Sequence, residues 1–175
     1  MKPALVVIDI QNDYFPGGAF PLDDAEGVLG RIEQAIGLAR QRDIPVILVQ
    51  HIARPPAGGT APFFNPGTSG VELHPRILAA APDAPIVVKH FADSFHQTTL
   101  DETLVALGVE EILLCGMMTQ NCVTHTALSR AADRYRVKVL GDCCTTVSLI
   151  LHRIALNALT TRLEVVDSAQ ALGAA

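Results

Sequence analysis

The 175-residue sequence has no tryptophan and only two tyrosines, and aromatic residues make up 5% of it. Its net charge of −5 comes from scattered side chains, so neither a basic stripe nor a stacking platform for nucleic acid is present. No apolar run approaches the roughly 20 residues that span a bilayer, and the amino terminus lacks a signal peptide's basic start and long apolar core. These absences predict a cytoplasmic protein that binds a small molecule and neither nucleic acid nor membrane.

Cofactor-binding patterns are also missing. The four cysteines, at positions 115, 122, 143 and 144, lack zinc-ribbon spacing, and a chain that is 49% hydrophobic can bury a core without disulfides. We therefore expect reduced thiols. No G-x-G-x-x-G or phosphate loop occurs, so no nucleotide cofactor is expected. Length and even composition predict a single domain over residues 1–175.

Short apolar runs alternate with helical patterns along the chain. Most of the runs are apolar on both faces, which is typical of a parallel sheet covered by helices on each side. The predicted strands are residues 4–10, 45–50, 86–89, 111–115, 137–140 and 163–166, and the predicted helices are residues 25–41, 98–107, 120–134 and 146–161. This order predicts an α/β fold with three layers, α/β/α. Residues 51–85, rich in Pro and Gly, are too long for an ordinary connection and are expected to line a site or an interface.

Three reactive side chains fall where predicted strands end. Asp9 lies near the end of an apolar strand, Lys89 closes residues 86–89, and Cys122 follows the fourth strand at the start of a helix. Ligands in open parallel sheets bind beyond the carboxyl ends of the strands, so we expect these groups to meet in one pocket. The helix start is expected to lower the pKa of the Cys122 thiol. The simpler alternatives are a structural Asp9–Lys89 ion pair and a cysteine that only fills space.

The segments around these residues resemble the isochorismatase-like cysteine hydrolases, which include nicotinamidases and N-carbamoylsarcosine amidohydrolases. The resemblance rests on Val7-Ile8-Asp9-Ile10-Gln11-Asn12-Asp13-Tyr14-Phe15, then Lys89, then Gly116-Met117-Met118-Thr119-Gln120-Asn121-Cys122-Val123, in the family's order. It implies a six-stranded, mostly parallel sheet of Rossmann-type topology.

The same resemblance implies a catalytic triad of Asp9, Lys89 and Cys122. It also implies a cis peptide between Met117 and Met118, and an oxyanion hole made by the backbone N–H groups of Met118 and Cys122. Four further residues are candidates for the substrate pocket: Gln11, Phe15, His51 and Phe91.

The sequence departs from nicotinamidases after the second predicted strand. Those relatives carry an Asp-x-His-x-x-His metal cluster there, whereas this chain has His51-Ile52-Ala53-Arg54-Pro55-Pro56. We therefore expect no metal and no other cofactor. His51 either touches substrate or hydrogen-bonds to the loop.

The expected activity is metal-independent hydrolysis of a C–N bond, in an amide, lactam or ureido compound, through a Cys122 thioester. Isochorismatases proper cleave a vinyl ether without needing the cysteine, so Cys122 favours C–N hydrolysis. Two alternatives remain open: an ether or ester hydrolase that uses the same pocket, and a non-catalytic thiol sensor or metabolite-binding protein. Residues 147–159 are apolar over a wide arc, and relatives often assemble, so a homodimer or homotetramer is expected.

Overall fold

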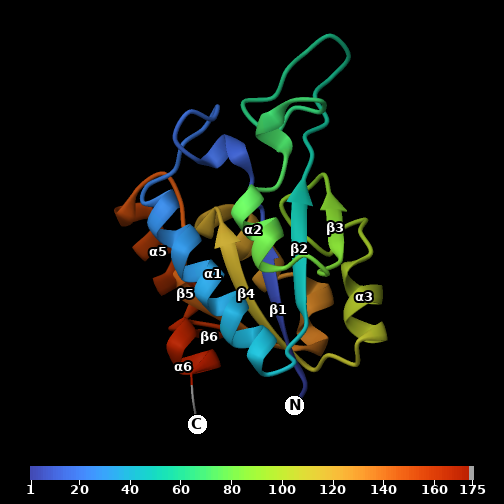
Figure 1. Ribbon diagram of the computed structural model, residues 1–175, viewed down its shortest axis with the longest axis vertical. Coiled ribbons are helices and arrows are strands. Elements are labelled where there is room, and N and C mark those ends of the chain that lie inside the picture. The colour runs from blue at the N-terminus through green and yellow to red at the C-terminus, as the bar shows by residue number, and fades with distance from the viewer. Residues whose placement is uncertain (174–175) are drawn as a thin grey trace.

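The computed structural model describes residues 1–173, and its centre is one sheet of six parallel strands in the order β3-β2-β1-β4-β5-β6 (Figure 1). The strands are β1 (Pro3–Ile8), β2 (Val46–His51), β3 (Ile86–Lys89), β4 (Glu111–Met117), β5 (Arg136–Thr145) and β6 (Glu164–Val166). The helices are α1 (Ala25–Gln41), α2 (Pro75–Ala80), α3 (Leu100–Ala106), α4 (Thr124–Ala127), α5 (Leu149–Leu159) and α6 (Ser168–Leu172). The predicted α/β class, three layers and six strands are confirmed.

Helices cover both faces of the sheet. In Figure 1, α1 lies in front of the strands with α2 and α6 near it, and the helices between β3 and β6 cover the other face. The central strands β1 and β4 are almost wholly buried, as their apolar sequences predict. The edge strand β3 differs, because Ile86 and Val88 are exposed while Val87 and Lys89 are buried. The expectation that nearly all strands are buried on both faces is therefore wrong at this edge.

Several element boundaries differ from the prediction. The helix expected over residues 120–134 is broken into a π-helical turn (Thr119–Val123), α4 and a 3-10 helix (Arg130–Arg134). Strand β5 runs on to Thr145, so Cys143 and Cys144 lie within a strand rather than after it. The long 51–85 segment contains a 3-10 turn (Ser69–Val71) and helix α2, which its Pro- and Gly-rich composition concealed.

Gly116 shows why β4 can pass so close to β1. Its φ is +125°, and a Cβ built there would lie 2.1 Å from the carbonyl oxygen of Ile8. Only glycine accommodates both this backbone conformation and this close approach. The adjacent strands are thereby brought together at the edge where Asp9 and Cys122 emerge.

All four cysteines are free and buried, as expected. No helix within residues 1–173 is long and apolar enough to cross a membrane. Helix α5 leaves the side chains of Leu149, Ile150 and Ile154 exposed, while Ala155 and Leu159 are buried. The apolar side chains of α5 therefore extend beyond the face that packs against the rest of the protein. Assembly of the chain into a homodimer or homotetramer stays a prediction.

Candidate active site

Asp9 follows β1 directly at the carboxyl edge of the sheet. Its backbone has φ 55°, a left-handed conformation that aspartate tolerates better than most residues, and its N–H donates to the carbonyl of Val49 at 3.0 Å. The side chain is fully buried. Sequence reasoning placed Asp9 inside the strand, whereas the strand ends at Ile8 and the chain turns sharply at Asp9.

Lys89 reaches this carboxylate from the edge strand. Alternation along β3 turns Lys89 inward, and the residue is 0% exposed. Its Nζ lies 2.9 Å from Asp9 Oδ2 and 3.2 Å from Cys122 Sγ. Two more acceptors complete the surroundings: His51 Nδ1 at 3.0 Å and the carbonyl oxygen of Phe91 at 3.1 Å. Four acceptors around three N–H bonds hold the ammonium in one place.

Cys122 is carried by the π-helical turn after β4. The turn is closed by the carbonyl of Met118, which accepts from the N–H of Asn121 at 3.0 Å and of Val123 at 3.3 Å. The peptide bond between Met117 and Met118 is cis. Cys122 is 2% exposed, and its sulfur, a carboxylate oxygen of Asp9 and a ring nitrogen of His51 all lie within 4.8 Å of one another.

The electrostatics of this cluster correct one prediction. Burial and the neighbouring carboxylate of Asp9 together raise the pKa of the Cys122 thiol to about 12, although Lys89 acts in the opposite direction. The thiol is therefore protonated at rest, and the expected lowering by a helix start is wrong. Burial by itself lowers the pKa of Lys89, but Asp9 and Cys122 outweigh it, so the pKa is raised and the ammonium stays charged.

His51 belongs to the same cluster. Burial, and then the Lys89 charge, lower its pKa to about 4, so the ring is neutral and its Nδ1 accepts a hydrogen bond from the ammonium. The other nitrogen, Nε2, then carries the proton. From the sequence, His51 was expected either to touch substrate or to hydrogen-bond to the loop. In the structure its ring instead hydrogen-bonds to Lys89.

A metal ion does not fit this arrangement. Within residues 1–173, Asp9, His51 and Cys122 form the one group of side chains that could offer three ligand atoms. The Lys89 ammonium already lies within 3.2 Å of all three, so it fills the position that a cation would take. Residues 51–56, His-Ile-Ala-Arg-Pro-Pro, also do not form an Asp-x-His-x-x-His pattern.

Three pocket candidates have mainly structural partners. Gln11 is fully buried, and its amide donates to the carbonyls of His51 and Val71 and accepts from the His51 N–H, so it joins β2 to the returning chain. Phe15 is buried against the ring of His74, with centroids 4.5 Å apart. Phe91 holds Lys89 through its carbonyl, while its half-exposed ring packs edge-on against His96.

Tyr14 is a site residue that the sequence reasoning missed. Its ring is buried against Phe64 and Phe63, with centroids 4.5 and 5.3 Å away. Burial, and then the proximity of Asp9 and Cys122, raise the pKa of its hydroxyl, which therefore stays protonated. The available signal was its place five residues after Asp9 and three before Gly17, in the segment that follows β1.

The segment that covers the cluster is held down by Asp13. One carboxylate oxygen accepts from the N–H of Phe64 at 2.7 Å, and the other accepts from the N–H of Ala19 at 3.1 Å. Phe64, fully buried, also lies 5.9 Å from the His51 ring. The long loop after β2, which rises above the sheet in Figure 1, therefore contributes an aromatic cover to the site.

The remaining histidines have other partners. His125 faces the carbonyl of Asn121 at 2.8 Å rather than the sulfur, so a Cys-His dyad is not formed. His152 on α5 lies 2.9 Å from the hydroxyl of Thr119, at the start of the π-helical turn that carries Cys122. His90 faces the carbonyl of Ile52.

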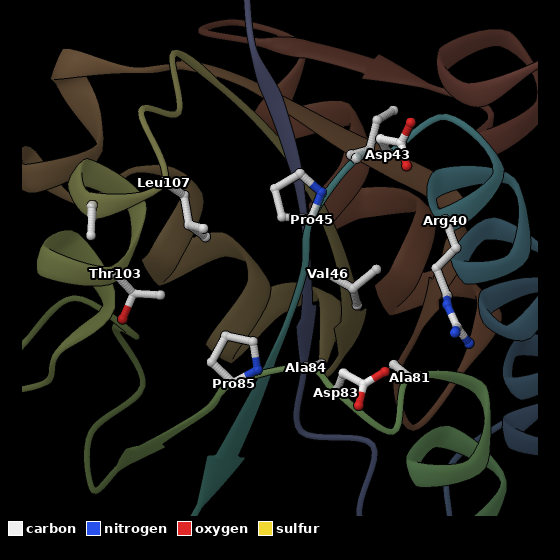
Figure 2. A pocket seen from close by; sticks show the side chains of 12 residues that line it. Arg40, Asp43, Pro45, Val46, Ala81, Asp83, Ala84, Pro85, Thr103 and Leu107 are labelled. Carbon is white, nitrogen blue, oxygen red and sulfur yellow. The ribbon is translucent and has the colours of Figure 1, made fainter.

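A separate hollow of about 630 Å³ lies at the opposite end of the sheet (Figure 2). Its walls come from the starts of β2 and β3, with Pro45, Val46 and Pro85, and from α3, with Thr103 and Leu107. None of the reactive groups of the cluster lines it.

Comparison with known proteins agrees with the geometry. The family model for the isochorismatase domain matches residues 3–171. The chain belongs to the isochorismatase family. It is 38% identical over 149 residues to YddQ, an uncharacterized isochorismatase family protein of Bacillus subtilis, covering 85% of this chain and 81% of that protein. It is 36% identical over 154 residues to the maleamate amidohydrolase of Pseudomonas putida, covering 81% and 71%.

Solved structures of the family share the fold. An isochorismatase-like hydrolase from Alkaliphilus metalliredigens superposes with a TM-score of 0.86 at 27% identity, over 98% of both chains. The family resemblance predicted from the sequence is confirmed, and this isochorismatase-family protein is a hydrolase.

Proposed function

We propose that this isochorismatase-family hydrolase cleaves a C–N bond of a small amide, lactam or ureido compound through a thioester on Cys122. One observation carries the proposal. The Lys89 ammonium lies 2.9 Å from the Asp9 carboxylate and 3.2 Å from the Cys122 sulfur, so a base, a cation and a nucleophile meet in one enclosed cluster. Each comes from the end of a different strand.

The first step moves a proton. The thiol is protonated at rest, and Asp9 is the neighbouring group able to accept its proton. The thiolate that forms is stabilised by Lys89, whose Nζ already contacts the sulfur. Because this ammonium is fixed by four acceptors, it needs little rearrangement when the negative charge moves from Asp9 to Cys122.

The thiolate then attacks the carbonyl carbon, and a C–S bond forms as the carbonyl π electrons move to oxygen. In the proposal, the backbone N–H groups of Met118 and Cys122 stabilise this oxyanion. Asp9 returns its proton to the nitrogen as the C–N bond breaks, because an unprotonated amine is a very poor leaving group. Water, deprotonated by Asp9, hydrolyses the thioester to a carboxylic acid and restores the thiol.

Two supports favour C–N cleavage over the ether and sensor alternatives. Similarity at 36% identity to a protein named maleamate amidohydrolase supports amide hydrolysis. A thiol that senses oxidants needs a low pKa and access to solvent, whereas Cys122 has a raised pKa and is 2% exposed. The buried carboxylate of Asp9 beside the thiol supports chemistry that moves a proton.

The experiment compares three proteins on a panel of small amides, lactams and ureido compounds. We expect Cys122→Ala to lower kcat by at least about a thousandfold, the scale of removing a covalent nucleophile. Cys115→Ala is the matched control, since Cys115 is an equally buried thiol in β4 outside the cluster. Intact-mass measurement on rapidly quenched wild type should show an acyl adduct that maps to Cys122. Normal turnover by Cys122→Ala would refute covalent catalysis.

A further inference from the structure

The π-helical turn that carries Cys122 is held by other elements at two points. Within residues 1–173, the side chains of residues 119–123 form two hydrogen bonds to residues outside segment 118–127. One joins Lys89 Nζ to the Cys122 sulfur at 3.2 Å, and the other joins His152 Nδ1 to the Thr119 hydroxyl at 2.9 Å. The proposed mechanism uses the first bond and gives the second no role.

Thr119 begins this turn and is fully buried. Its carbonyl oxygen accepts from the Thr124 hydroxyl at 2.6 Å, but Thr124 belongs to the helix that continues the turn, so this bond moves with it. The hydroxyl of Thr119 has one partner within the described residues 1–173, the His152 ring. That bond therefore fixes the start of the turn against a different element of the protein.

The partner ring is supplied by helix α5, which packs against the turn. His152 is half-buried there. Burial, and then the charges of Arg153 and Arg31, lower its pKa, although Asp23 acts in the opposite direction, so the ring is neutral near neutral pH. A neutral imidazole has one nitrogen that accepts and one that donates, so Nδ1 can bond to the Thr119 hydroxyl while Nε2 is left for solvent.

The start of the turn lies close to both proposed oxyanion donors. Met118 directly precedes Thr119, and Cys122 follows three residues later. The carbonyl of Met118 accepts from the N–H groups of Asn121 and Val123, so the turn is one hydrogen-bonded unit. A shift at Thr119 therefore moves the sulfur and both N–H groups together. Displacing a reacting group by about 1 Å can cost about a hundredfold in rate.

We infer that His152 is a positioning residue, whose hydrogen bond to Thr119 holds the turn where the Cys122 sulfur contacts Lys89. The inference rests on the proposed function and adds to it a residue that does not touch the reacting atoms. Loss of the bond should slow the chemical step and leave substrate binding nearly unchanged.

The first test separates kcat from KM on whichever amide of the panel wild type turns over. His152→Leu removes both ring nitrogens, and we expect kcat to fall at least about tenfold while KM changes less than about threefold. His152→Asn keeps a polar group near the Nδ1 position and should keep kcat within about threefold of wild type. Arg153→Ala, exposed on the same helix, is the control and should leave both constants unchanged. An unchanged kcat in His152→Leu, or an equal fall in His152→Asn, would overturn the inference.

A double-variant cycle tests the bond itself. Thr119→Val removes the hydroxyl, keeps the shape of the side chain, and should lower kcat about as much as His152→Leu. The double variant should be no slower than either single variant, because each alone already breaks the bond. Losses that multiply in the double variant would show that the two residues act separately, and would overturn the inference.

Alkylation of the thiol separates this inference from the proposed function, because it needs no substrate. Cys122 is 2% exposed, so a loosened turn should let iodoacetamide at pH 8 label it at least about fivefold faster in His152→Leu than in wild type. Cys115, fully buried in β4, is the internal control for general unfolding and should not label faster. Mass mapping of the labelled peptides distinguishes the two thiols.

The outcomes divide cleanly between the two proposals. Should wild type turn over no amide, the proposed function fails, and faster labelling of Cys122 alone still supports positioning by His152. Equal labelling of Cys122 in His152→Leu and wild type, or a parallel acceleration at Cys115, would overturn the inference.

Discussion

The ion pair between Asp9 and Lys89 can be tested as a catalytic pair and as a structural one in the same experiment. Both side chains are 0% exposed, their charged atoms are 2.9 Å apart, and neither Asp9 oxygen has another hydrogen-bond partner within residues 1–173. Lys89→Met removes the cation and keeps a side chain of similar length. The variant leaves a carboxylate buried without a counter-charge.

The magnitude follows from this geometry. At 2.9 Å and an effective dielectric constant of about 20, the attraction is about 6 kcal/mol. Breaking a buried pair by removing one partner costs about 3–5 kcal/mol. This cost is smaller than the attraction because the remaining group relaxes or takes up a proton. For a protein of this size the expected fall in Tm is roughly 6–20 °C. Urea unfolding with unchanged m-value should give the same loss of stability.

The double variant Asp9→Leu/Lys89→Met decides between the two roles. Replacing a buried pair by apolar residues of similar volume is often neutral or stabilising, so we expect most of the lost stability to return. Turnover should stay at least a hundredfold below wild type, because the proton acceptor and the cation are both gone. A double variant that recovers turnover together with stability would show that the pair is structural. A single variant as stable as wild type would refute the electrostatic reasoning itself.

Three further predictions concern the backbone, the imidazole and the thiol. Gly116→Ala should lower the unfolding free energy measured in urea by more than about 2 kcal/mol. The reason is that the added Cβ would lie 2.1 Å from the Ile8 carbonyl oxygen, in a backbone conformation with φ +125°. A variant as stable as wild type would show that β1 and β4 can separate there. The pKa of His51 is lowered to about 4, so the unfolded chain binds its proton first, and stability should fall as pH drops from about 6.5 towards 4. His51→Asn keeps an acceptor near the Nδ1 position and cannot titrate, and its stability should depend less steeply on pH over that window; equal slopes would contradict the assignment. Iodoacetamide at pH 8 should modify native Cys122 much more slowly than a free cysteine, because burial and then Asp9 raise the pKa of this thiol to about 12. Intact-mass measurement follows the labelling. Rapid labelling of Cys122 would support the sensor alternative.

The convergence of the site was predictable because parallel strands align their carboxyl ends. Asp9, Lys89 and Cys122 each follow or end a strand, and the order β3-β2-β1-β4 places those three strand ends side by side with only β2 between. Alternation along β3 also fixes which face Lys89 takes. The parallel arrangement of the strands, which the sequence predicted, is sufficient to bring the groups to one edge of the sheet.

The sign of the thiol's pKa shift was not predictable from the same patterns. A helix start and a nearby ammonium lower a thiol pKa, whereas burial and a carboxylate raise it, and the balance depends on distances. Here the sequence pattern indicated a long helix after β4, but Cys122 lies in a π-helical turn closed on the carbonyl of Met118. Periodicity of 3.6 residues cannot distinguish such a turn from an α-helix.

The parts of the site contributed by loops were the hardest to predict. His51 was recognised as a candidate, yet its bond to Lys89 depends on β2 and β3 being paired with His51 opposite Lys89, a register that no local pattern records. The role of Tyr14 depends on Phe63 and Phe64, some fifty residues later, packing over it. Long-range loop contacts of this kind are fixed by side-chain fit, not by periodicity.

The raised thiol pKa bears directly on how the site would be switched on. With the proton on sulfur and the charge on Asp9, the Lys89 ammonium has one full anion to balance, and all three side chains are buried. Moving the proton to Asp9 transfers that anion to Cys122, and Lys89 contacts both positions, at 2.9 and 3.2 Å. The transfer therefore shifts a charge around a fixed cation without creating a new one.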